Sequence, residues 1–153
     1  MTGPAKHLGH LARRFVGALS NMPPPAVDDA WAARFLGDGE ARLWWQMQAQ
    51  DRRHSIEVAR RFVTLVDDAP REAVAAALMH DVGKILSRLS VAERVAATII
   101  GARTERFRLY HDHGRLGAVM LREAGASAST VALVEGTSTD TTFAEALRRA
   151  DDI

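Results

Sequence analysis

Four side chains able to bind a metal ion lie in three separated segments of the chain. His54, the adjacent pair His80 and Asp81, and Asp151 each occupy a position that helical periodicity predicts to be buried. An unpaired polar group inside an apolar core costs roughly 2–7 kcal/mol, and an unpaired charge costs more. Imidazole and carboxylate groups that converge in such a place usually surround a divalent cation. The pattern therefore predicts a metal site.

His54 lies on the apolar face of a helix predicted over about residues 51–66. It shares that face with Val58, Phe62 and Leu65, at steps of four, four and three residues. We therefore expect its side chain to point inward. A core histidine hydrogen-bonded to a carbonyl is the competing interpretation for His54 taken alone.

His80 and Asp81 follow the most apolar stretch of the chain, the seven consecutive apolar residues 73–79 in a helix predicted over 71–82. A helix that is apolar on all sides belongs at the centre of a bundle. Neighbouring helix positions differ in direction by about 100°, so these two side chains reach one ion only from two sides of a crevice. The competing interpretation is a helix end emerging into solvent, which Val82 and Gly83 also fit.

Asp151 falls on the apolar face of the last predicted helix, residues 142–151, whereas Asp152 points about 100° away from it. Asp151 is therefore the better ligand candidate, and a solvated chain end is the alternative. Because helix ends fray, we expect Asp151 to be the least firmly placed of the four, in a domain that is either minimal or shortened.

The chain contains no cysteine, so nitrogen and oxygen atoms must hold any metal. Two imidazoles and two carboxylates suit one divalent ion from a broad set: Mn, Fe, Co, Ni, Mg or Zn. Four protein ligands leave an octahedral ion with open positions for water and a phosphate oxygen. This is the arrangement of metal-assisted hydrolysis.

Two further side chains are expected beside the ligands. Lys84 follows His80 by four residues and Asp81 by three, so a continuing helical turn places its charge over the same crevice, near a substrate phosphate. An ordinary basic helix end is the alternative. His113 leads a helix whose inward face includes Gly117, and it could act as a nearby base, a substrate contact or a fifth ligand.

The remaining pattern predicts an all-helical fold, because apolar residues recur three and four apart. Residues 1–25 are expected to form an N-terminal basic amphipathic helix (5–20) and a proline-rich linker, and residues 26–153 the main domain. Asp28 or Asp29, and then Asp38, are predicted to cap two short helices. Further helices are predicted at about 84–89, 91–101, 103–110, 113–124 and 128–135.

Composition excludes several classes of partner. The 153 residues carry a formal net charge of +1, with 47% hydrophobic and 25% charged residues, which gives no general affinity for nucleic-acid polymers or membranes. No apolar run reaches about 18 residues, and the N-terminus lacks a signal-peptide core. We therefore expect a cytoplasmic protein.

Four segments together resemble the HD-domain superfamily of metal-dependent phosphohydrolases. The resemblance spans roughly residues 51–151 and implies an all-α HD-domain bundle in which His54, His80, Asp81 and Asp151 bind one divalent ion. It further implies that Asp81 helps to orient the nucleophilic water and that Lys84 lies near the phosphate. The segments are Arg53-His54-Ser55-Ile56-Glu57-Val58-Ala59, Ala77-Leu78-Met79-His80-Asp81-Val82-Gly83-Lys84, His113-Gly114-Arg115-Leu116-Gly117-Ala118 and Leu147-Arg148-Arg149-Ala150-Asp151.

The chain departs from the two-metal members of that superfamily, which carry a further histidine pair after the helix that begins at His113. The corresponding residues 134–138 contain no histidine, and Glu135 could substitute only weakly. We therefore expect one metal ion, with His113 beside it. Arginines such as Arg52, Arg53 and Arg115 could supply charge at the rim, although solvated surface is the commoner role.

The leading hypothesis is a hydrolase that cleaves a phosphoester of a nucleotide or related small metabolite, with Asp81, Lys84 and His113 as the catalytic side chains. The main alternative is a catalytically reduced HD module that binds metal and a nucleotide as a regulatory or sensing domain. A third is a structural helical domain that works through surface tryptophans among Trp31, Trp44 and Trp45.

Overall fold

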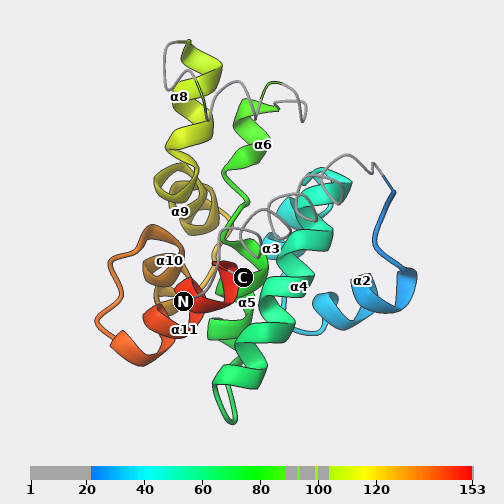
Figure 1. The fold of residues 1–153 in the computed structure, drawn as a ribbon, viewed down its shortest axis with the longest axis vertical. Helices are drawn as coiled ribbons and strands as arrows, with labels where there is room; N and C mark the ends of the chain where they lie inside the picture. Colours follow the sequence, from blue (N-terminus) through cyan, green and yellow to red (C-terminus); the bar gives the residue numbers. More distant parts are fainter. Residues whose placement is uncertain (1–21, 89–92, 94–98, 100–103, 153) are drawn as a thin grey trace, which may run out of the picture.

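The computed structural model describes residues 22–88, 93, 99 and 104–152. The regular elements of this part of the chain are all α-helices (Figure 1), which confirms the all-helical fold. No helix within it is long and apolar enough to cross a membrane. The N-terminal helix expected over 5–20 lies outside the described residues, and so does the helix expected over 91–101 except at residues 93 and 99. The helices are α2 (Ala26–Ala33), α3 (Asp38–Trp44), α4 (Ala49–Leu65), α5 (Arg71–Met79), α6 (Lys84–Ser87), α8 (Glu105–His111), α9 (His113–Glu123), α10 (Ala128–Glu135) and α11 (Thr141–Asp151).

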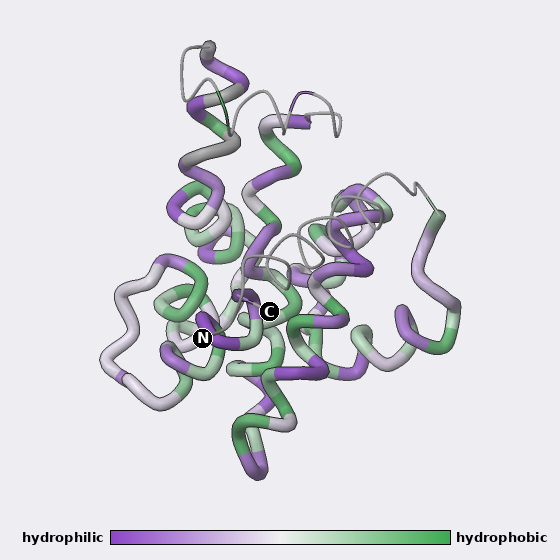
Figure 2. The backbone as a smooth tube through the Cα atoms, in the orientation of Figure 1, coloured by the Kyte–Doolittle hydropathy of each residue, from purple (hydrophilic) through white to green (hydrophobic). Residues whose placement is uncertain are grey.

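Helix α5 lies at the centre of the bundle, as its apolar sequence predicts. Every residue from Ala73 to Met79 is buried. On one side α5 packs against α4, which in turn carries α11, and on the other it packs against α10, which carries α9. Buried apolar residues of these helices form the core, and hydrophobic residues are green on the tube in Figure 2. Because His80 and Asp81 follow directly after this buried helix, they lie in the interior of the bundle.

The chain turns more tightly after α5 than a continuous helix to residue 82 would allow. Helix α5 ends at Met79, and the backbone then folds through bonds between residues three apart, from Val82 N–H to the Met79 carbonyl and from Lys84 N–H to the Asp81 carbonyl. Short bonds of this kind tighten the end of a helix. The predicted boundary at 82 was wrong, but the tight turn still brings Lys84 back over Asp81.

The helix starts follow local chemistry, with two corrections. Gly37 precedes α3 as its N-cap, so Asp38 is the first helical residue and not the cap, while Glu40 accepts a hydrogen bond of 2.7 Å from Gly37 N–H. Pro25 holds the corresponding place before α2, so Asp28 and Asp29 lie in its first turn. A carboxylate there is stabilised by the helix dipole without being a cap.

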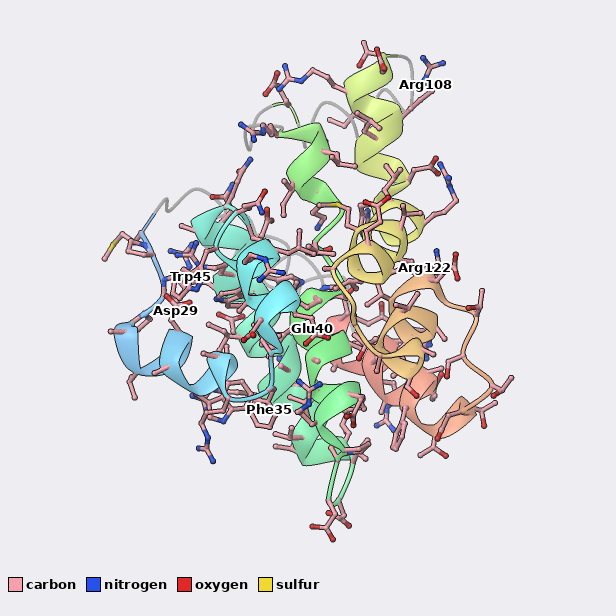
Figure 3. The ribbon with its side chains drawn as sticks, turned by 180° about the vertical axis from the view of Figure 1, so that it is seen from behind. Asp29, Phe35, Glu40, Trp45, Arg108 and Arg122 are labelled. Atoms are coloured by element: carbon pink, nitrogen blue, oxygen red, sulfur yellow. The ribbon has the colours of Figure 1, made fainter. Side chains whose placement is uncertain are left out.

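The face of α4 that carries His54 is buried along most of its length. Val58 and Phe62 are fully buried, but Leu65 is 39% exposed, so the predicted apolar stripe ends one turn early. The adjacent tryptophans Trp44 and Trp45 differ in burial. Trp44 is buried and donates a hydrogen bond to Asp29. Trp45 is exposed, and Figure 3 labels it together with Asp29.

Candidate metal centre

Three ligand-type side chains converge where α4 passes the end of α5. His54 comes from the second turn of α4, and His80 and Asp81 follow α5. One ligand atom of each lies within 4.8 Å of the other two, and no other such group occurs among the described residues. Asp81 is only 3% exposed. A buried carboxylate between two imidazoles is the environment that a divalent cation stabilises.

Asp151 joins this group from α11, at the opposite end of the sequence. Its Oδ1 lies 2.9 Å from His54 Nε2 and 3.5 Å from His80 Nε2. Asp152 instead forms an exposed ion pair of 2.6 Å with Arg148. The structure therefore brings Asp151, and not Asp152, to the two histidines, which is the choice that helical phase favours.

The orientation of His80 tests whether the site fits a metal ion. Its Nδ1–H donates a hydrogen bond of 2.8 Å to the Ala77 carbonyl, which can only accept. The neutral ring therefore carries its lone pair on Nε2. This atom is buried, has no hydrogen-bond partner within the described part of the chain, and faces Asp81 Oδ2 at 3.6 Å. A cation bound there would satisfy the lone pair and neutralise the carboxylates, so the donor set fits.

The electrostatics of the cluster point the same way. Burial disfavours the imidazolium of His80, but the negative charge of Asp81 and the contact with Asp151 outweigh burial and raise the pKa of His80. Burial also opposes ionisation of Asp81, yet nearby positive charge, chiefly from His80 and Lys84, holds the pKa of Asp81 well below its usual range. The hydrogen bond with His54 and the nearby ring of His80 lower the pKa of Asp151. Both carboxylates are therefore ionised and ready to bind a cation.

Lys84 and His113 each contact one of the two carboxylate oxygens of Asp81. Lys84 Nζ is 2.6 Å from Oδ2, and His113 Nε2 is 3.3 Å from Oδ1. His113 reaches this position because the backbone at the start of α9 packs directly against the backbone of Gly83. A Cβ built on Gly83 would lie 1.9 Å from the His113 carbonyl oxygen. Only glycine at 83 lets the start of α9 come this close.

The candidate rim residues have other contacts. Arg52 is largely buried, donates to the Met47 carbonyl and lies over the Trp45 ring, whereas Arg115 pairs with Asp112 on the surface. Arg61 was not among the residues selected from the sequence, and its guanidinium donates a hydrogen bond of 3.2 Å to the Ala150 carbonyl. Its spacing of seven residues from His54 was the available signal, since positions seven apart share a helix face.

Asparagine substitutions at 151 and 152 form a matched pair. We expect Asp151→Asn to weaken divalent metal binding by roughly tenfold or more, because a charged oxygen between two imidazoles becomes neutral. Asp152→Asn should leave the affinity unchanged, because it breaks only an exposed ion pair. Calorimetric titration with Mn²⁺ measures both, and equal affinities for the two variants would contradict this assignment.

The fold is an all-helical bundle, and imidazole and carboxylate donors gather beside the end of α5. These two features define the class of the protein: a helical bundle with a candidate site for a divalent metal ion. The comparison with known families places the chain within that class: residues 52–150 match the HD domain. The chain belongs to the HD-domain family, whose members are typically metal-dependent phosphohydrolases. No curated protein and no solved structure matches the chain.

Proposed function

We propose that this chain is a phosphohydrolase that holds one divalent ion through His54, His80, Asp81 and Asp151. The observation that carries the proposal is the buried Nε2 of His80, which lacks a hydrogen-bond partner among the described residues and faces two carboxylates. Leaving such an atom unsatisfied costs about 1–3 kcal/mol. A bound cation removes that cost.

A divalent ion at this site would supply positive charge to a phosphoryl group and lower the pKa of a water molecule. The chain's own residues supply the rest. In this proposal Asp81 orients the attacking water, supported by its contacts with Lys84 through one oxygen and with His113 through the other. His113 is one-third exposed, so its ring can exchange a proton between the site and solvent. Lys84 is the cation beside the incoming phosphate.

We propose one ion, because residues 134–138, which correspond to the segment with the histidine pair in two-metal members, contain no histidine. Glu135 faces Arg122, with 3.6 Å between its Oε2 and the guanidinium, and Val134 is buried. The nitrogen and oxygen donor set is compatible with Mn, Fe, Co, Ni, Mg or Zn. We further propose a small phosphorylated substrate, a nucleotide or related metabolite, in keeping with the family and with Lys84 and His113 beside the cluster.

A two-part experiment tests this proposal. Metal-free protein is supplemented with each candidate ion, its bound metal is measured by elemental analysis, and the loaded protein is screened against phosphomonoesters and phosphodiesters, including nucleotides. We expect about one ion per chain and hydrolysis that chelation abolishes. Protein that takes up no divalent ion would contradict the proposal.

The alternative is a regulatory HD module that binds metal and a nucleotide without turnover. It is favoured by the 2.6 Å ion pair that engages Lys84 with Asp81 and by the absence of histidine from residues 134–138. If the metal-loaded protein hydrolyses no member of the panel, yet a nucleotide raises its melting temperature, the alternative is correct.

A further inference from the structure

The last turn of α11 is held against α4 at two points. One is the contact between His54 Nε2 and Asp151 Oδ1, and the other is the hydrogen bond from Arg61 Nη1 to the Ala150 carbonyl. His54 and Arg61 are seven residues apart, which is nearly two helical turns, so they project from the same face of α4. The same face of α4 therefore contacts both the side chain of Asp151 and the backbone that carries it.

The reach of Arg61 follows from the direction of the two helices. His54 contacts Asp151, and Phe62 contacts Phe143 with ring centroids 6.4 Å apart, so α4 and α11 run antiparallel. Long side chains on a helix lean toward its N-terminus. Arg61 leans from the level of Phe143 toward the level of His54, which is the direction of Ala150.

The chemistry at this end of α11 suits a guanidinium. The last four carbonyls of a helix have no partner within the helix, and the partial negative charge there attracts a cation. Ala150 is fully buried, so its carbonyl has limited access to water, and Arg61 supplies the missing donor. Glu57, one turn earlier on α4, lies 3.5 Å from the other guanidinium nitrogen.

We propose that Arg61 is the positioning residue for Asp151. Its hydrogen bond to the Ala150 carbonyl sets the last turn of α11 so that the Asp151 carboxylate faces His54 and His80. The inference rests on the proposed metal site, because Arg61 contacts neither substrate nor metal and acts only through Asp151. Asp151 is 41% exposed and is the least buried of the four proposed ligands, so it has the greatest need of such support.

The test is a titration of the metal-free chain with MnCl₂, followed by calorimetry. We expect Arg61→Met to weaken Mn²⁺ binding by roughly tenfold, the loss that typically follows removal of a group that orients a ligand. Arg61→Lys, which keeps a charged donor, should recover most of it. The matched control is Arg148→Met on α11, which removes only surface pairs with Glu145 and Asp152 and should leave the affinity unchanged.

A double-mutant cycle separates positioning from a general structural effect. If Arg61 acts through Asp151, then Arg61→Met has no further effect on Mn²⁺ affinity in the Asp151→Asn background. An equal loss in both backgrounds would overturn the inference, and so would parental affinity in Arg61→Met. Titration of His80→Ala in parallel separates the two proposals. If His80→Ala loses binding while Arg61→Met does not, this inference alone fails, and retained binding in His80→Ala removes the proposed site as well.

Discussion

His80→Ala is expected to abolish metal binding and hydrolysis together. The substitution removes the buried Nε2 that faces Asp81 and Asp151. The loss of affinity should exceed the roughly 10–100-fold that accompanies removal of a residue that only orients a ligand. Elemental analysis and calorimetry measure the metal, and the best substrate of the phosphoester screen measures the activity.

Asp81→Asn is the companion variant, because it keeps the shape of the side chain and removes only its charge. We expect the same joint loss, with helical content retained by circular dichroism. The matched control is Asp112→Asn, since the Asp112 carboxylate is exposed and pairs with Arg115. Metal-dependent hydrolysis that survives in both His80→Ala and Asp81→Asn would sink the proposed function.

We expect Gly83→Ala, which adds a single methyl group, to be strongly destabilising. The added Cβ would lie 1.9 Å from the His113 carbonyl oxygen and 2.8 Å from the Gly117 nitrogen, and both are backbone atoms. Because α9 must move, we expect a loss of about 3 kcal/mol or more. For a domain of this size that corresponds to a melting temperature lower by roughly 6–12 °C.

The sign of this effect distinguishes packing from backbone conformation. Gly83 has a φ of −61° and a ψ of −20°, which any residue adopts, so without the collision alanine would be neutral or stabilising. Gly114→Ala on α9 is the matched control, because its Cβ would meet the Val134 carbonyl only at 3.4 Å. Thermal melts of the metal-free proteins check this, and a Gly83→Ala variant as stable as the parent would contradict the packing argument.

Gly83→Ala should also separate binding from turnover. The residues that contact the metal in the proposed site lie on α4, after α5 and on α11, whereas His113 depends on the approach of α9 to Gly83. Displacing α9 moves His113 away from Asp81 Oδ1. We therefore expect hydrolysis to fall more than Mn²⁺ affinity.

Helical periodicity predicted those features that depend on the direction of a side chain along one helix. It predicted that His54 and Asp151 point inward and that Asp152 does not, and it predicted Lys84 near Asp81. These positions follow from local geometry of about 100° per residue. The same reasoning failed at Leu65, which is 39% exposed, because exposure near a helix end depends on which neighbour covers it.

Features that depend on contact between distant segments could not be predicted. Helical spacing puts Arg61 on the same face of α4 as His54, but no local pattern identifies the carbonyl of Ala150, 89 residues away, as its acceptor. Arg52 likewise lies 3.5 Å from the carboxylate of Asp29 on α2, and no local pattern predicts that pairing. The requirement for glycine at position 83 likewise cannot be read from its own backbone conformation, because it arises from the short distance between Gly83 and α9.

The contact between His54 and Asp151 joins positions that are 97 residues apart in the sequence. Closing a loop of that length is slow compared with forming a helix, because the entropy of closure must be overcome before any contact compensates for it. The complete set of proposed ligands is therefore expected to assemble only after α4, α5 and α11 have docked. Metal capture is expected to be a late kinetic event that slows unfolding far more than it accelerates folding.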